Sequence, residues 1–231
     1  MLRLMKLELK KFKFGWYLRG AVIANIIILA LLIFVSFVAQ IEGDPEIRDP
    51  QTILLMASAS VRATFIIFGS VLIARLIIGE YKNKTILLMF SYPINRQKMM
   101  ASKLAITAIV TFITVIVSNI LVVGIFFGLD SYFSILPNSF TVDQLLQEGI
   151  KLVPLATATA GMSLIPLYFG MRKRSVPTTI VSSLIVVSIA MNSNPAFSTA
   201  TFLPLQLALA AIGVVIAYYG IKNIEKEDIT V

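Results

Sequence analysis

The sequence predicts an all-α, polytopic membrane protein with six transmembrane helices, and three observations support this fold class. Of the 231 residues, 58% are hydrophobic and only 14% are charged, whereas a soluble domain carries about 25% charge. Uncharged runs recur at about the 20 residues that a helix needs to cross roughly 30 Å of hydrocarbon. Lysine and arginine concentrate in alternate connecting segments, which is the bias that orients membrane helices.

Residues 1–14 predict an interfacial helix, because basic side chains lie on one helical face and apolar side chains on a neighbouring face. The basic residues are Arg3, Lys6, Lys10 and Lys13, and the apolar residues are Leu2, Met5, Leu9 and Phe12. An ordinary basic flank that anchors the first span is the alternative. Residues 20–41 then form the first span, which is longer than the apolar region of a signal peptide and lacks a small-residue cleavage site.

The second span is predicted at residues 53–79, although it contains two arginines. Arg62 is expected in its outer half and Arg75 near its inner end, so both are predicted to snorkel to an interface. A substrate or gating role is the alternative for each of them.

The remaining spans are predicted at 104–128, 152–170, 177–191 and 200–220. The last two share one uncharged stretch that is too long for a single crossing, and the turn-forming residues 192–195 divide it. An outer loop at 129–151 contains Thr141, a candidate cap for a short helix leading into the fourth span. Residues 221–231 form the tail.

The charges of the connecting segments predict that both termini are cytoplasmic. Sixteen of the 20 lysines and arginines lie in the N-terminal segment, the 80–103 loop, the connection after residue 170 and the tail, whereas the outer connections hold only Arg48 and Lys151. The positive-inside rule assigns the first set to the cytoplasm. Because this charge is spread over four juxtamembrane segments without interleaved aromatics, it does not indicate nucleic-acid binding.

Composition excludes several catalytic classes. The chain has no cysteine and no histidine, so cysteine chemistry, HExxH metal sites and Ser-His-Asp triads are ruled out. No G-x-x-x-x-G-K-[ST] phosphate loop occurs. No carboxylate falls inside a predicted span, so an ion-coupled carboxylate relay has no candidates. We expect no enzyme activity, no metal and no cofactor on this chain.

Small residues recur in two spans with the spacing that lets helix backbones approach closely. Ala156 with Ala160 and Gly213 with Ala217 are each four residues apart. Packing within one chain and packing across a dimer are both compatible with this pattern.

The 80–103 loop is the most informative segment. Charged residues precede an apolar run that is too short to cross a membrane, and the Ser91-Tyr92-Pro93 sequence ends the predicted helix. Such a helix exposes apolar side chains that need a partner, either another protein's groove, the bilayer interface or the bundle itself. For Glu80, Lys82, Lys84 and Arg96, a solvated flank that fixes topology is the alternative.

The order of residues in this loop resembles the first cytoplasmic loop of ABC-2 type permeases, the small six-span membrane subunits of ATP-binding cassette exporters of the bacitracin, lantibiotic and peptide export or immunity type. The pattern runs Glu80-Tyr81-Lys82-Asn83-x-Thr85-Ile86, then Ser91-Tyr92-Pro93-Ile94-x-Arg96, then Lys103. The resemblance implies that residues 83–90 form a coupling helix that docks on a separate ATPase. The implied contact residues are Glu80, Tyr81, Lys82, Asn83, Thr85, Ile86, Leu87, Met89, Phe90 and Arg96, with Glu80 and Arg96 bracketing the contact.

The resemblance also implies a bacterial plasma membrane, a second permease subunit, identical or related, and ATP with Mg on the partner ATPases. The implied cargo is an amphipathic or antimicrobial-type peptide or another hydrophobic substrate. The long re-entrant helices that gate some such families are not expected, since the last outer connection covers only about residues 192–199. A secondary transporter with a helix broken at Pro166 and a non-transporting immunity or scaffold protein remain alternatives.

Overall fold

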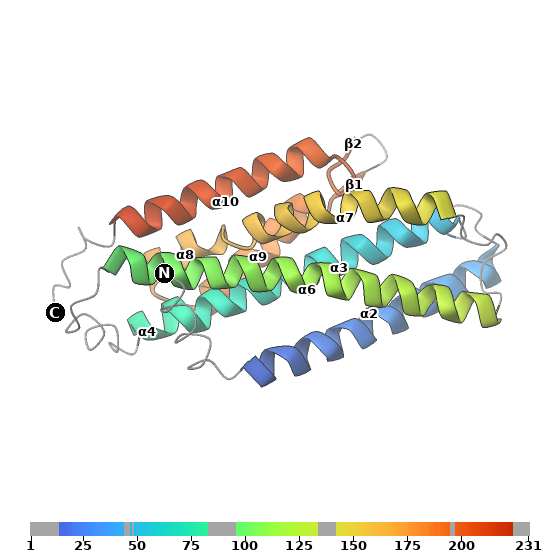
Figure 1. Ribbon diagram of the computed structural model, residues 1–231, viewed down its shortest axis with the longest axis horizontal. Coiled ribbons are helices and arrows are strands. Elements are labelled where there is room, and N and C mark those ends of the chain that lie inside the picture. The colour runs from blue at the N-terminus through green and yellow to red at the C-terminus, as the bar shows by residue number, and fades with distance from the viewer. Residues whose placement is uncertain are drawn as a thin grey trace.

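The computed structural model describes residues 14–43, 47, 49–82, 96–133, 142–194 and 197–223, which form an elongated helical bundle (Figure 1). In chain order the elements are α2 (Phe14–Glu42), α3 (Pro50–Ile73), the π-helix η1 (Ala74–Ile78), α4 (Gly79–Lys82), α6 (Arg96–Phe133), α7 (Val142–Met162), α8 (Pro166–Lys173), α9 (Val176–Ala190), β1 (Ser193–Asn194), β2 (Phe197–Ser198) and α10 (Leu203–Asn223). The two strands pair antiparallel over two residues each. The prediction of an all-α fold is therefore confirmed apart from this short β-hairpin.

Within the described residues, five helical stretches are long and apolar enough to cross a membrane. They are Gly15–Glu42, Pro50–Ile78, Gln97–Tyr132, Gln144–Lys173 and Leu203–Lys222. They include most or all of five predicted spans. The predicted fifth span, 177–191, corresponds to α9, which is apolar but has only 15 residues. The structure thus provides five long candidates and one short one.

The helices extend beyond the predicted spans. α6 continues to Phe133 and α7 begins at Val142, so much of the predicted outer loop 129–151 is helical. The predicted interfacial helix at 1–14 lies outside the described residues except for Phe14, which begins α2. The predicted coupling helix at 83–90 also lies outside the described residues.

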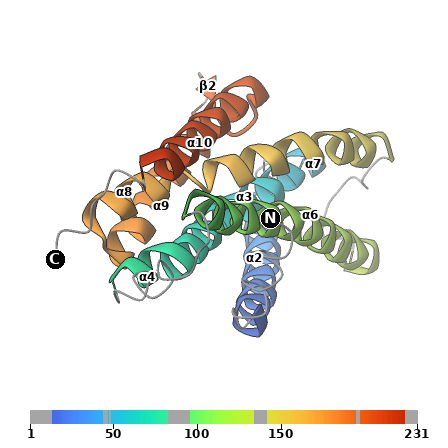
Figure 2. The ribbon, with the colours of Figure 1, turned by 60° about the vertical axis from the view of Figure 1, so that its left-hand side comes forward.

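The chain runs back and forth between the two ends of the bundle. We call the end that carries the start of α2, α4, the start of α6, the end of α8 and the end of α10 the basic end, after Arg19, Lys98, Arg172, Lys173 and Lys222. The opposite end, where α2 leads into α3 and α6 leads into α7, is the far end (Figures 1 and 2).

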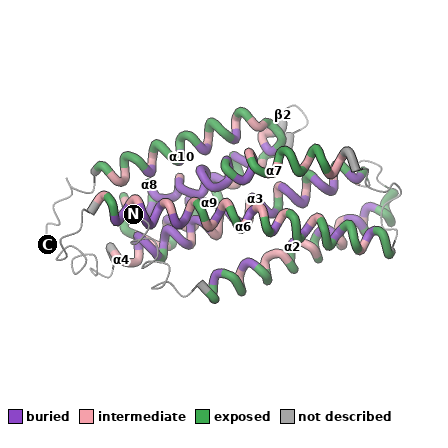
Figure 3. Tube along the Cα trace, viewed as in Figure 1, coloured by how far each residue is buried: buried purple, intermediate pink, exposed green. Residues whose placement is uncertain are grey.

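α3 is the central helix of the bundle. It contacts α2, α6, α7, α8 and α9, and 67% of its most apolar window is buried, against 28% for α2 and 22% for α10. Figure 3 shows this difference as a mostly buried α3 between helices with long exposed faces. A movement of α3 would therefore disturb the packing of most of the other helices.

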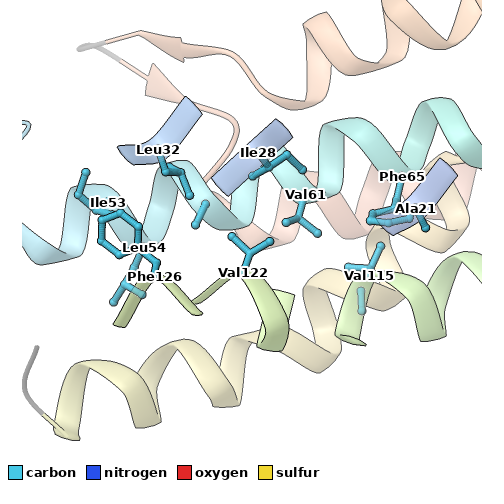
Figure 4. Packing of buried hydrophobic residues seen from close by; sticks show 12 residues of the cluster. Ala21, Ile28, Leu32, Ile53, Leu54, Val61, Phe65, Val115, Val122 and Phe126 are labelled. Carbon is cyan, nitrogen blue, oxygen red and sulfur yellow. The ribbon is translucent and has the colours of Figure 1, made fainter. Parts of the chain in front are cut away.

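Apolar side chains fill the bundle in three clusters along its length. One cluster joins α2, α3, α6 and α7 through residues that include Ile28, Leu32, Val61, Phe65 and Val122 (Figure 4). The second lies at the basic end and the third joins α3, α7, α9 and α10. The outward faces of α2 and α10 expose large apolar side chains, as helices that face lipid do.

The small residues pack α7 against α10 within one chain. Gly161 lies against Ala210, and a Cβ added at Gly161 would lie 2.6 Å from the Cβ of Ala210. A Cβ added at Gly213 would collide with the carbonyl oxygen of Gly161. The two backbones therefore touch, which is the arrangement that small residues permit. Of the four small residues named from the sequence, Gly213 belongs to this contact within one chain.

α10 begins at Leu203, well short of the far end. From the contact between Gly161 and Ala210, α7 continues back to Val142 whereas α10 continues back only to Leu203. At 1.5 Å per residue, α7 reaches about 18 Å farther toward the far end, as Figure 1 shows. The β-hairpin between α9 and α10 consequently lies part-way along the bundle.

The predicted fourth span is interrupted just before Pro166. Residues 163–165 form a turn between α7 and α8. The N–H of Leu164 donates to the carbonyl oxygen of Gly161, and the N–H of Ile165 donates to that of Met162, both at 3.1 Å. These bonds span three residues instead of the four of an α-helix. Pro166 has no backbone N–H and begins α8, a position that suits proline. The turn lies just after Gly161, where α7 touches α10.

Candidate functional site

The candidate site lies at the basic end, where α4 ends at Lys82 and α6 begins at Arg96. Lys103 of α6 forms an ion pair with Glu80 of α4 and donates a further hydrogen bond to the carbonyl oxygen of Leu76 at 2.9 Å. The two charged side chains are 4% and 15% exposed. The ion pair therefore joins the two ends of the loop inside the protein.

The backbone acceptor of Lys103 lies in a π-helical turn. η1 occupies residues 74–78, and the N–H of Gly79 donates to the carbonyl oxygen of Ala74, five residues earlier. Such a turn shifts the register of the helix and leaves carbonyl groups without their usual partners. The ammonium group of Lys103 donates to the carbonyl oxygen of Leu76, which belongs to this turn. π-helical turns are frequent at functional positions.

A second cation, Arg75 of η1, contacts an aromatic ring of α2 near the same end of the bundle. The guanidinium carbon of Arg75 lies 3.8 Å from the ring centroid of Trp16 in α2. Such a cation–π contact stabilises by about 0.5–1 kcal/mol when it is exposed. Arg75 is exposed, as a snorkelling side chain at the membrane boundary should be.

The structure places the predicted ATPase-contact residues in three groups. Asn83, Thr85, Ile86, Leu87, Met89 and Phe90 lie outside the described residues. Tyr81 and Lys82 belong to α4, and Arg96 begins α6. Glu80 does not stand on a free surface, because its carboxylate faces Lys103. We therefore assign Glu80 a role in holding the loop ends.

The expectation that Arg62 snorkels is wrong. Its side chain is 2% exposed and lies inside the bundle. Nε donates to Ser58 O at 3.2 Å, one terminal nitrogen donates to Ala200 O at 3.1 Å, and the other donates to the side-chain oxygen of Gln206. The carbonyl groups of the α9–α10 connection are not all used by regular helix, so they supply acceptors that the sequence alone did not reveal.

Gln206 completes this buried polar cluster. It is fully buried, and its amide nitrogen donates to Thr199 O at 3.1 Å and Ala200 O at 2.7 Å. Sequence reasoning missed it. The available signal was a single glutamine near the start of a long apolar run, while Arg62 lay 144 residues away in sequence.

Hydroxyl groups on α6 make further contacts with polar side chains of α2. Tyr17 and Thr114 are 3.2 Å apart, and Asn25 donates to Ser118 at 2.9 Å. Thr107 and Thr111 lie on the same face of α6 and are fully buried. Within the described part of the chain, no group of three or more potential metal-ligating side chains occurs.

The comparisons with known proteins agree with this geometry. Residues 4–188 match the family model described as ABC-2 family transporter protein. The chain is 42% identical over 227 residues to the uncharacterized protein YcbO of Bacillus subtilis (strain 168), covering 98% of this chain and 100% of that protein. No solved structure matches.

The family match spans more than half of the chain and includes the segment between α4 and α6. Members of this family are membrane subunits that generally pair with an ATP-binding cassette ATPase and do not themselves hydrolyse ATP. The several long apolar helices are those of a multi-pass membrane protein. The chain therefore belongs to the ABC-2 transporter family and is a membrane permease subunit of an ATP-binding cassette transporter.

Proposed function

We propose that this permease couples ATP hydrolysis on a separate ATPase to the export of an amphipathic peptide or another hydrophobic substrate, and that residues 83–90 dock on that ATPase. The observation that carries the proposal is the Glu80–Lys103 ion pair, which joins α4 before the docking segment to α6 after it. In this proposal the basic end faces the cytoplasm of a bacterial plasma membrane, α9 crosses as a sixth span, and two permease subunits pair with two ATPases.

The ion pair gives the docking segment a mechanical connection to the bundle. A displacement of residues 83–90 acts on α4 and α6 together, because Lys103 holds both Glu80 and the carbonyl of Leu76. η1 continues directly into α3, the central helix. Movement at the basic end would thus reach the helices that α3 contacts.

The secondary-transporter alternative depended on a helix broken at Pro166. Residues 163–165 do form a turn before Pro166, but family membership assigns the chain to a transporter that pairs with a separate ATPase. We therefore do not propose ion coupling.

Aspartate at Ile86 and Met89 is expected to abolish copurification of the chain with its partner ATPase when the two are coexpressed. Two carboxylates in an apolar docking face would remain unpaired, and unpaired buried charge is strongly unfavourable. The measurement is affinity purification of the tagged permease from membranes, followed by ATPase quantification and assay of peptide-stimulated hydrolysis.

Ile150→Asp is the matched control, because Ile150 is 76% exposed at the far end. It should keep the ATPase bound. Equal recovery of ATPase with Ile86→Asp/Met89→Asp and wild type would refute the docking proposal, as would equal loss with the control.

Replacing Glu80 with glutamine is expected to lower the free energy of unfolding by about 3 kcal/mol, because the buried ammonium of Lys103 loses its counter-charge. The reversed pair Glu80→Lys/Lys103→Glu should recover part of this loss but not all, since a carboxylate cannot donate to Leu76 O. Thermal unfolding of the detergent-solubilised protein provides the measurement.

The surface pair Glu148–Lys151 offers the control. Its side chains are 23% and 54% exposed, and such pairs contribute about 0–1 kcal/mol. Glu148→Gln should therefore have a smaller effect than Glu80→Gln. Similar effects of the two variants would show that the Glu80–Lys103 pair does not stabilise the site.

A further inference from the structure

A groove with a volume of about 460 Å³ lies between α8 and α10 at the basic end. Leu167, Met171 and Ile216 give it apolar walls, and Tyr168, Arg172 and Tyr219 also line it. A Cβ added at Gly220 would lie 3.3 Å from Leu167 and 3.7 Å from Met171. The absence of a side chain at Gly220 therefore keeps space available in the groove.

Basic side chains surround the end of this groove. Arg172, Lys173 and Arg174 are consecutive and exposed at the end of α8, and Lys222 is exposed in the last turn of α10. Arg174 adopts a left-handed backbone conformation, with φ of 46°, and its N–H caps α8 by donating to Met171 O at 3.4 Å. The residues that line the groove include no carboxylate.

The groove changes from apolar to cationic along its length, as an amphiphilic lipid in a bilayer changes from apolar chain to charged headgroup. α8 and α10 both run toward the basic end, so Leu167 and Ile216 lie about 6–8 Å deeper than Arg172 and Gly220. The groove is consequently apolar toward the middle of the bundle and cationic at its end. Arg172 lies 3.5 Å from the hydroxyl of Tyr168, so a guanidinium and a phenol stand together at the boundary.

We propose that this groove binds one anionic phospholipid, with the phosphate at Arg172 and Lys173 and an acyl chain along Leu167, Met171 and Ile216. Basic pockets between membrane helices are typical sites for anionic headgroups. Tyrosine and arginine side chains favour the headgroup boundary. The positive charge and the polarity gradient favour an anionic lipid over an uncharged ligand. The lipid would come from the leaflet at the basic end.

Native mass spectrometry of the detergent-solubilised full chain provides the test. The protein is titrated with phosphatidylglycerol, with phosphatidylcholine carrying the same acyl chains, and with soluble glycerol phosphate. Wild type is expected to retain one phosphatidylglycerol at least tenfold more tightly than phosphatidylcholine and to show no binding of glycerol phosphate, which lacks the acyl chain.

Arg172→Gln/Lys173→Gln should weaken phosphatidylglycerol binding by about tenfold or more, because each basic residue near a charged headgroup contributes about fivefold. Arg19→Gln removes an exposed positive charge from α2 at the same end and should leave the tight site unchanged. Gly220→Leu should displace the lipid by filling the groove, and a second groove variant, Ile216→Trp, covers the case in which Gly220→Leu does not fold.

Four outcomes would overturn the proposal. Equal retention of phosphatidylglycerol and phosphatidylcholine would show that the basic residues do not recognise the headgroup. Equal weakening by Arg172→Gln/Lys173→Gln and Arg19→Gln would show general surface attraction. Lipid binding that is unchanged in both groove variants would show that the lipid does not occupy the groove. A groove closed by a second copy of the chain in a stable dimer would show that this surface is a subunit interface.

Discussion

Replacing Gly213 with leucine is expected to separate α10 from α7 and to lower the free energy of unfolding by more than about 3 kcal/mol. Overpacking in a membrane or soluble core costs about 1–3 kcal/mol when flexible side chains can move aside. Here the added atoms meet the backbone carbonyl of Gly161, which cannot move without shifting α7. Thermal unfolding and the fraction of monodisperse protein after solubilisation measure the effect.

Gly124 provides a control for this substitution. It lies in α6, and a Cβ added there meets no atom within 4 Å. Gly124→Leu should be neutral or slightly stabilising, because leucine has the higher helix propensity. A Gly213→Leu protein as stable as Gly124→Leu would contradict the close packing of α7 and α10.

Replacing Gln206 with leucine is expected to destabilise the protein by about 3 kcal/mol, and more than replacing Arg62 with leucine. Loss of Gln206 leaves the buried guanidinium of Arg62 without one of its three acceptors, and an under-satisfied charge is costlier than an under-satisfied neutral group. Loss of Arg62 instead leaves only the side-chain oxygen of Gln206 unpaired. Apparent unfolding temperatures of the single variants give the comparison.

The double variant Arg62→Leu/Gln206→Leu distinguishes this explanation from a simple loss of packing. Replacing both partners by apolar groups can be almost neutral, so the double variant should be more stable than Gln206→Leu alone. Gln147→Leu, at an exposed glutamine of α7, controls for the amide-to-leucine change. Additive losses in the double variant would mean that Arg62 and Gln206 do not act together.

The sequence predicted the long helices well because lipid imposes a simple rule on them. A run of apolar residues without charge, such as 20–41 or 104–128, has to satisfy its backbone internally and therefore becomes a helix. The exact ends were less accurate. α6 and α7 continue past the apolar runs into polar sequence, since amphipathic turns such as those at 142–151 remain helical when one face packs against a neighbour.

The candidate site was predicted in part. The motif marked the loop between the second and third predicted spans, and both Glu80 and Lys103 belong to it. Their contact could not be predicted, because it depends on the π-helical turn at 74–78 and on how α3 and α6 cross. Nothing in a run of Ala, Arg, Leu and Ile distinguishes a π-turn from ordinary α-helix.

The environment of Arg62 could not be predicted from its position along the predicted span. Hydropathy treats an arginine as a charge that must reach water, whereas a second segment 138 residues away in sequence provides its acceptors. Such a partner becomes visible only when tertiary structure brings the α9–α10 connection beside α3. Gln206 was overlooked for the same reason.

The short helix α9 has a consequence for the membrane itself. Its 15 residues span about 22 Å, and the large apolar side chains Val181, Leu184, Ile185 and Ile189 are exposed along it. A hydrocarbon layer of about 30 Å must become thinner beside α9 in the six-span arrangement proposed above, at a cost of fractions of a kcal/mol per Å of hydrophobic mismatch. In the proposed pair, two permeases that met along this side would share one thinned patch of bilayer, and membrane deformation would favour their association without any specific contact.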